Sequence, residues 1–364
     1  MLLSFDKSEK IFIIICKRFG NIYLYYAIRR KDKEMSENKE QHITSIGGQA
    51  IIEGVMMRGP FKTAYAVRKS DGEIVTEVKE NGTKNRPLFC KFPIVRGCVN
   101  FIDSLVIGMK ALMFSAEFMD IEDEEESESK FDKWLEEKFG DKIKDIVIYV
   151  SIVLSLFLSV GLFILLPSVV TGGIESLFSL FAPLKAAAST QAFTSICEGI
   201  LRMVIFLTYL ALVSKMKDIQ RVFEYHGAEH KTIACYEAGE ELSVENVKKY
   251  TRFHPRCGTS FLLFVMVISI LVFTLLPRFD EYGKILQILL RMATRIALLP
   301  VVAGLSYEII KLAGRSRNTC VKWLTKPGLW LQKLTTREPD DSQIEVAIAS
   351  MQAVIPDNRE EDKW

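Results

Sequence analysis

Long apolar runs alternate with polar stretches from residue 146 onward. They cover Ile146–Leu166, Ile196–Val213, Ser260–Leu276 and Ile285–Ile310. Each run reaches or approaches the roughly 20 apolar residues that a helix needs to cross a bilayer core. The pattern predicts a four-helix transmembrane region at 146–310, whose last helix is long enough to tilt or to extend beyond the membrane. The expected fold class is mainly α, a multi-pass helical membrane protein.

Gly97–Met119 is also apolar, but its charged residues follow a pattern. Asp103, Lys110 and Glu117 recur every seven residues, which places them on one face of a helix. A helix lying at the membrane surface fits this pattern better than a helix that crosses. We therefore expect region 96–145 to hold surface or amphipathic helices joined by an acidic linker.

A small β-rich unit is expected at residues 47–95. The four glycines of Gly47–Pro60 are typical of tight turns and close backbone approach. Residues alternate in character through Tyr65–Val78 on both sides of the pair Asp71-Gly72, and this pattern predicts a β-hairpin. We expect the unit to lie on the cytoplasmic side.

An extension, residues 1–46, precedes this unit. Lys17 and Arg18 interrupt its apolar stretches, and no small-residue cleavage signal follows, so a signal peptide is not expected. Met35 is a second candidate start, and residues 1–34 are expected to be a start-site artefact or a dispensable extension.

The charges of the connecting loops predict the orientation in the membrane. Loop 167–195 contains one basic residue, whereas loop 214–259 contains eight. Because cytoplasmic loops carry an excess of Lys and Arg, we expect loop 214–259 and both termini in the cytoplasm. Residues 311–364 are then a cytoplasmic helical tail, and the protein is placed in the cell membrane with several crossings.

Composition excludes some classes of function. The chain of 364 residues is 49% hydrophobic, and its formal net charge is only +2. That balance provides no basic surface for nucleic acid, so no nucleic-acid partner is expected. The seven cysteines include no CxxC pair, which argues against a disulfide framework and suits a reducing compartment.

The motif HxxEH is the strongest chemical signal in the chain. His226 and His230 lie four residues apart, so both imidazoles project from one face of a helix toward one metal ion. Glu229, beside the second histidine, is placed to act as general base on metal-bound water. A hydrogen-bonded interfacial cluster without metal is the alternative, and the sequence leaves it open.

Three further residues are candidate metal ligands. His254 and Cys257 precede the third apolar run, and Glu308 lies at the cytoplasmic end of the fourth. Nitrogen, thiolate and carboxylate donors suit a divalent metal, most simply zinc. Arg256 is a candidate for stabilising negative charge that develops during catalysis.

One geometric difficulty accompanies this metal hypothesis. If the helix of the second run continued past Ser214, His226 would stand about 18 Å further along the axis at 1.5 Å per residue. His254 lies only a few residues from the third run. Convergence therefore requires a bend, for which Gly227 is one candidate.

Charged residues within the apolar runs indicate contacts between helices. Glu198 and Arg202 share a face of the second run, and Arg291 and Arg295 share a face of the fourth. Charges at such positions are costly and usually paired, so we expect an interhelical ion-pair cluster. They also keep a transport function open.

Several long motifs resemble those of the YqhQ-like family of bacterial membrane proteins. They are GGQAIIEGVMMRGP, EYHGAEHKTIACYE, HPRCGTSF and PGLWLQKLTTREPDDSQIEVAI, and the resemblance covers roughly residues 46 to 355. The family carries a domain of unknown function, and some of its members are labelled as metal-dependent enzymes. The resemblance implies a metal at His226, Glu229 and His230 but no substrate.

Three classes of function remain open. The first is a membrane-bound metal-dependent enzyme, most simply a hydrolase acting on a lipid, a lipid-linked molecule or a membrane-proximal peptide. The second is a non-catalytic factor that presents a cytoplasmic platform to a membrane or cytoplasmic protein partner. The third is a transporter. Many transporters contain internal sequence repeats, and none is evident in this chain, which counts against this class. The lipid bilayer is the one partner common to all three, and the oligomeric state is left undetermined.

Overall fold

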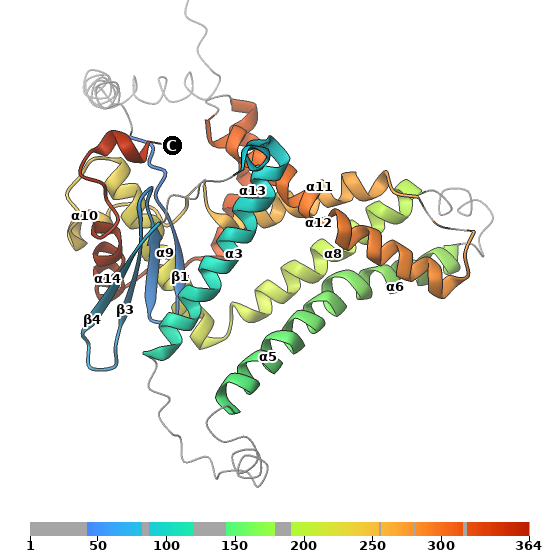
Figure 1. Cartoon of the computed structure of the whole chain (residues 1–364), viewed down its shortest axis with the longest axis horizontal. Helices are drawn as coiled ribbons and strands as arrows, with labels where there is room; N and C mark the ends of the chain where they lie inside the picture. The colour runs from blue at the N-terminus through green and yellow to red at the C-terminus, as the bar shows by residue number, and fades with distance from the viewer. Residues whose placement is uncertain are drawn as a thin grey trace, which may run out of the picture.

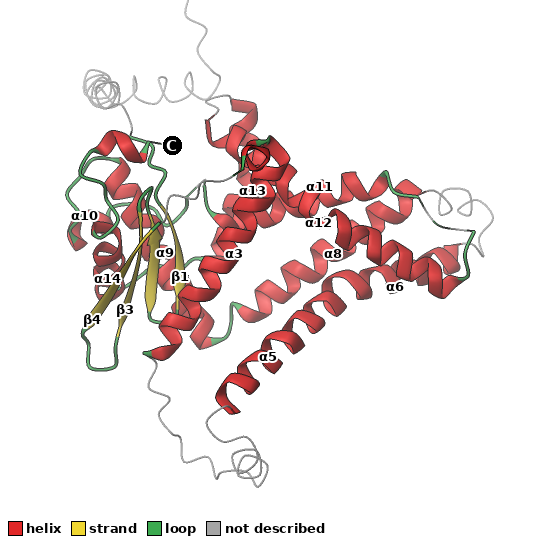
Figure 2. Cartoon of the chain, viewed as in Figure 1, coloured by secondary structure: helices red, strands yellow, loops and turns green. Residues whose placement is uncertain are grey.

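The chain is mainly helical, with one small antiparallel sheet near the N-terminus (Figures 1 and 2). The computed structural model describes residues 42–81, 87–118, 143–178, 191–254, 256–277, 279, 281–315 and 319–363. The expected dispensable segment 1–34 and the acidic linker lie outside the described residues. In Figure 1 the sheet lies on the left, and helices α5, α6 and α8 extend away from it.

The sheet has four strands in the order β1-β2-β3-β4. The strands are β1 Gly47–Ile51, β2 Gly54–Arg58, β3 Lys62–Arg68 and β4 Ile74–Glu80. The hairpin expected around Asp71-Gly72 is confirmed, since β3 and β4 pair from Lys62–Glu80 to Arg68–Ile74. Gly72 has φ +88°, a left-handed conformation that glycine adopts without steric cost.

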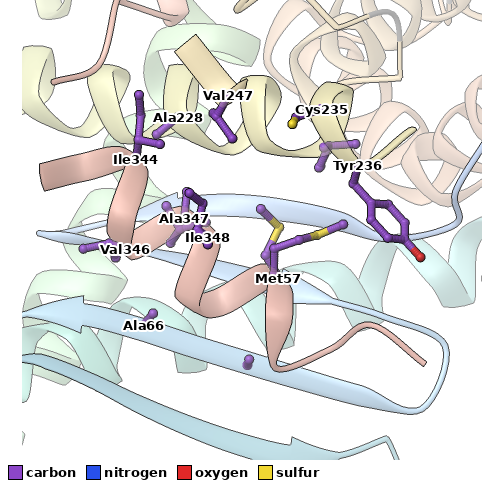
Figure 3. Packing of buried hydrophobic residues seen from close by; sticks show 14 of the residues in the cluster. Met57, Ala66, Ala228, Cys235, Tyr236, Val247, Ile344, Val346, Ala347 and Ile348 are labelled. Carbon is purple, nitrogen blue, oxygen red and sulfur yellow. The ribbon is translucent and has the colours of Figure 1, made fainter. Parts of the chain in front are cut away.

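One face of the sheet is covered by two helices that lie far apart in the sequence. They are α9, Lys217–Glu237, and α14, Asp341–Gln352. Side chains from all three elements, such as Met57, Ala228 and Ile344, form one hydrophobic core (Figure 3). The short helix α10, Val244–Lys248, adds Val247 to the same core. The expected C-terminal tail is thus packed into a unit with the N-terminal sheet.

The opposite face of the sheet is covered by α3, Pro93–Glu117. Ala111 of α3 is buried with Met56 and Tyr65 of the sheet. The N-terminal half of α3 instead crosses α12, Lys284–Arg315, where an added Cβ on Gly97 would lie 2.7 Å from the Cα atom of Gly304. Small residues at a crossing let two helix backbones approach closely.

The other apolar helices follow the expected runs with shifted ends. They are α5 Ile143–Val160, the π-helical turn η3 Gly161–Leu165, α6 Leu166–Phe178, α8 Gln191–Val213 and α11 Gly258–Thr274. Within the described chain, four helical segments are long and apolar enough to cross a membrane: 93–117, 153–174, 193–213 and 286–312. The set includes α3, which the sequence placed at the membrane surface, and α11 falls just short of the length.

The chain turns sharply between α8 and α9. Met216 has extended backbone angles, φ −71° and ψ 134°, so the helix of the second run does not continue into the motif. Gly227 lies inside the uninterrupted helix α9, so the bend is not at that residue. The turn at 214–216 removes the geometric difficulty, because it lets α9 run back along the sheet.

Helix α13 and a buried aspartate near the C-terminus complete the fold. Helix α13, Thr319–Thr335, leads from α12 toward α14. Near the C-terminus, Asp362 is fully buried and accepts hydrogen bonds from Thr44 Oγ1 and His42 Nε2, at 2.6 Å each. Short 3-10 turns occupy Leu88–Lys91 and Arg359–Asp362.

The charged residues within the apolar helices form the expected interhelical ion pair. Arg295 of α12 pairs with Glu198 of α8, and both side chains are buried. Arg202 donates from Nε to the carbonyl oxygen of Phe163 in the π-helical turn, at 2.9 Å. A widened turn frees backbone carbonyls, and this one satisfies part of the guanidinium.

Candidate metal centre

Helix α9 presents the HxxEH motif on its buried side. Glu229 and His230 are 4% and 1% exposed, and His226 is partly buried beside them. Gly227 permits the segment after α13 to pass closely, since a Cβ at this position would fall 2.0 Å from the carbonyl oxygen of Arg337. That close passage brings the end of α13 next to His226.

Both motif histidines use one ring nitrogen to bind the backbone. His226 Nδ1 lies 2.9 Å from the carbonyl oxygen of Thr335, and His230 Nδ1 lies 2.6 Å from that of Arg252. A carbonyl oxygen only accepts, so each Nδ1 carries the proton. Each Nε2 then carries a lone pair and no proton, the form in which imidazole binds a metal.

Cys257 supplies a third donor at the same point. Its Sγ lies 3.2 Å from His226 Nε2, and the donor atoms of His226, His230 and Cys257 all lie within 4.8 Å of one another. Donors around a tetrahedral zinc ion are about 3.3–3.6 Å apart, given Zn–N of about 2.0 Å and Zn–S of about 2.3 Å. Two imidazoles and one thiol are a donor set that zinc accepts, so these residues could hold a metal ion of this kind.

Glu229 faces both histidines without being one of the three donors. Its Oε2 lies 3.7 Å from His226 Nε2 and 3.8 Å from His230 Nε2. Burial raises the pKa of the Glu229 carboxyl, and the nearby His226 and the backbone N–H of Gly48 lower it in part. A buried carboxyl with a raised pKa beside metal donors is suited to accept a proton from water.

His254 and Arg256 belong to an adjacent polar cluster centred on Glu237. His254 Nε2 lies 3.7 Å from Glu237 Oε2, and Arg256 forms an ion pair with the same carboxylate. Burial lowers the pKa of His254, and burial alone would raise that of Glu237, but His254 and Arg256 hold it below its usual range. The His254 ring centre is 5.6 Å from that of His230. His254 therefore lies beside the candidate donors but is not one of the three that converge among the described residues.

Glu308 is placed differently from the sequence-based expectation. Both of its carboxylate oxygens accept hydrogen bonds from Arg96 of α3, at 2.7 to 3.2 Å. A bidentate pair of this kind occupies the carboxylate. The expected role of Glu308 as a metal ligand is therefore replaced by a link between α3 and α12. The sequence offered no signal for Arg96 as its partner.

Sequence reasoning also missed the groups that orient the donors. Gly48 of β1 approaches so closely that a Cβ on it would lie 2.7 Å from the Glu229 Cγ atom. The glycine pair Gly47-Gly48 carried the signal of close approach, but its partner was not identifiable. The carbonyls of Thr335 and Arg252 carry no sequence signal, because every residue has one.

The centre opens into a cavity of about 780 Å³. Its walls come from the sheet, from α9, from the first turn of α11 and from the inner faces of α3 and α12. His226, Glu229, His230 and Cys257 all lie on the wall. Such a volume accommodates a small organic molecule or the head of a larger one.

Comparison with known proteins identifies the family. A family model described as "Protein of unknown function (DUF1385)" matches residues 92–357. The chain belongs to the DUF1385 family. It is also 36% identical over 317 residues to "Uncharacterized protein YqhQ" of Bacillus subtilis (strain 168), covering 85% of this chain and 92% of that protein. No solved structure matches.

The DUF1385 match contains the whole candidate centre. Residues 92–357 include α9 with the HxxEH motif and the segment that carries His254 and Cys257. The expected resemblance to YqhQ-like proteins is confirmed as family membership. Neither the family description nor the name of the Bacillus relative gives an activity or a metal, so the chemistry rests on the residues themselves.

Proposed function

We propose that this DUF1385 protein is a membrane-bound, metal-dependent enzyme, most simply a hydrolase. The observation that carries the proposal is the convergence of two Nε2 atoms and one thiol, with both Nδ1 atoms fixed by backbone carbonyls. Holding the second ring nitrogen in this way is the usual support for histidines that bind metal.

The roles of the side chains follow from their positions. His226, His230 and Cys257 hold a divalent ion, for which zinc is the best match. A bound zinc ion supplies Lewis acidity and brings the pKa of a water molecule down to about 7. Glu229 accepts the proton of the attacking water and returns it to the leaving group. Arg256, already paired with Glu237, contributes only a partly neutralised positive charge to the cavity.

Packing supports crossings by α5–α6, α8, α11 and α12, with α3 at the interface. The sheet precedes α3, α9 lies between α8 and α11, and α14 follows α12, yet the sheet, α9 and α14 pack in one core. They must therefore share one side of the membrane. If α5–α6 and α8 each cross, α3 does not, because the chain has to return to the same side. The eight basic residues of loop 214–259 favour the cytoplasm for that side.

A non-catalytic membrane factor is the alternative function. The core formed by the sheet, α9 and α14 is a compact unit that a protein partner could recognise. That function requires no metal, so metal content separates the two proposals. The transporter hypothesis loses its main support, since Arg295 and Glu198 pair with each other between helices.

Elemental analysis of the detergent-purified protein tests the proposed function. We expect about one zinc per chain in the wild type, since the site offers a single donor cluster within the described residues. A double variant, His226→Ala with His230→Ala, should lose the metal. Glu308→Gln is the matched control, because Glu308 binds Arg96 and should leave metal content unchanged. A wild-type protein free of transition metal would reject the enzyme proposal and favour the non-catalytic factor.

A further inference from the structure

The cavity beside the metal centre is roofed by helix α3. Asn100, Ser104 and Ile107 line it. Their spacing places them on one side of a helix. The motif residues of α9 line the opposite wall of the cavity. Asn100 also links α3 to α12, because its side-chain amide donates a hydrogen bond to Tyr307 Oη at 2.9 Å. The cavity thus lies between the metal centre and a helix that meets the apolar part of the molecule.

The opposite side of α3 carries an exposed apolar stripe. Its members are 38% to 57% exposed, and they are Ile102, Leu105, Val106, Met109, Leu112 and Met113. Helical geometry puts this stripe about 180° from the side that lines the cavity. Leu262 of α11, itself 43% exposed, also lines the cavity. Exposed apolar surface on this scale is typical of contact with lipid.

The charge of the cavity wall favours an anion. Arg58, at the end of β2, lines the cavity, and its side chain makes no hydrogen bond or ion pair within the described chain. Arg256 adds a second guanidinium, and Glu229 is the only carboxylate among the lining residues of that part of the chain. A guanidinium has a planar fork of donors that matches the oxygens of a phosphate group.

We propose that this cavity binds a membrane amphiphile whose headgroup carries a phosphate, with Arg58 as the residue that binds the phosphate. The inference rests on the proposed function for the role of the metal, and it names the substrate class. The headgroup lies between Arg58 and the donor cluster. The apolar tail leaves past Ile107 and Leu262 toward the lipid that covers the α3 stripe.

A soluble phosphate compound shares the headgroup chemistry but has no tail. The two sources differ in what the apolar wall contributes to binding. If the amphiphile is right, the tail adds affinity through burial of apolar surface, and a longer tail binds more tightly than a shorter one. A soluble phosphate compound gains no affinity from the apolar wall of the cavity.

Equilibrium binding to the full chain in detergent tests the proposal with three probes. They are dioctanoyl phosphatidic acid, dioctanoylglycerol and inorganic phosphate. We expect phosphatidic acid to bind at least tenfold more tightly than either of the others. If dioctanoylglycerol binds as tightly as phosphatidic acid, the claim that the cavity recognises a phosphate group is overturned. If inorganic phosphate binds as tightly, the claim that the ligand is an amphiphile is overturned.

Variants of the cavity wall locate the bound molecule. Arg58→Gln should weaken binding of phosphatidic acid about tenfold to a hundredfold, as loss of a charged hydrogen bond does. Arg58→Lys should keep part of the affinity that Arg58→Gln loses, because the lysine retains the positive charge. Gly47→Leu should also weaken binding of phosphatidic acid. Gly47 lines the cavity, and an added Cβ there meets no atom within 4 Å, so the leucine side chain would take up space that the ligand needs. Lys69→Gln is the control, since Lys69 pairs with Glu73 on the surface.

Melting temperatures of the same variants guard against misfolding. An Arg58→Gln protein that melts as the wild type does, and binds phosphatidic acid equally well, would overturn the proposal. The variant that loses both His226 and His230 separates this inference from the proposed function. In that variant, phosphatidic acid binding that still depends on Arg58 shows that the binding site does not need the metal. A wild-type protein that holds no zinc, but whose phosphatidic acid binding depends on Arg58, keeps the binding site and rejects the enzyme proposal.

Discussion

His226 and His230 show how single atoms define the candidate centre. Each ring presents Nε2 because its Nδ1 is bound to a carbonyl, at Thr335 or Arg252. The sequence predicted the helix and the shared face of the two rings. It could not choose between His254 and Cys257, because that choice depends on the direction of an irregular backbone. Only the folded chain places the Cys257 thiol beside His226.

Gly227 sits where α9 meets the segment after α13. In an open helix, changing Gly to Ala stabilises by roughly 0.5–1 kcal/mol. Here the added Cβ would fall 2.0 Å from the Arg337 carbonyl oxygen, so Gly227→Ala should destabilise, by about 1–3 kcal/mol. Thermal unfolding in detergent measures the change. A higher melting temperature for Gly227→Ala would contradict the close passage.

Glu229→Gln separates the role of base from that of ligand. The Glu229 carboxylate stands 3.7 Å from His226 Nε2 and is not among the three converging donors. We expect Glu229→Gln to keep its zinc and lose catalytic activity, because the amide cannot accept the proton of water. Cys257→Ser is the comparison, and it should lower zinc content. Loss of zinc from Glu229→Gln would make this residue a ligand.

Helix α3 is the element whose position was hardest to derive. Its seven-residue charge pattern indicated a surface helix, whereas its length and hydropathy also meet those of a crossing helix. Packing explains both properties, because one half of α3 covers the sheet and the other half crosses α12. By contrast, the hairpin at Asp71-Gly72 was predictable, since a local turn and local alternation determine it.

The crossing of α3 and α12 depends on two glycines. Gly97→Val should separate the helices, because its Cβ would lie 2.7 Å from Gly304. We expect less folded Gly97→Val protein than wild type in mild detergent. Size-exclusion chromatography measures this loss. Gly173→Val in α6 is the matched control, since an added Cβ there meets no atom within 4 Å. Equal behaviour of the two variants would show that the crossing is not tightly packed.

The whole molecule joins segments from both ends of the chain. The sheet near the N-terminus, the α9 motif and α14 near the C-terminus share one core. This union was not derivable from local patterns, because they give no long-range pairing. The sequence treated residues 311–364 as a separate tail, yet Ile344 and Met351 of that region are fully buried. Hydropathy alone, by contrast, predicted three of the four helical segments that are long and apolar enough to cross a membrane, whereas the run at Ser260–Leu276 forms a helix that falls short of that length.

The shared core makes a prediction about topology. Single cysteines introduced near Glu240, which is exposed, should be protected from membrane-impermeant reagents in intact cells. A cysteine near Ser179, in the loop with one basic residue, should react from outside. Asn246 gives a second position beside the sheet unit. Reaction from outside at Glu240 or Asn246, with protection at Ser179, would reverse the orientation.

X-ray absorption at the zinc edge tests the metal centre most directly. We predict a first shell with one sulfur at about 2.3 Å and two imidazole nitrogens at about 2.0–2.1 Å, completed by oxygen. The sulfur signal should disappear in Cys257→Ser and stay unchanged in Glu308→Gln, because Cys257 is the thiol that lies with His226 and His230 among the described residues. A shell of nitrogen and oxygen alone in the wild type, or one unaffected by Cys257→Ser, would contradict the assignment.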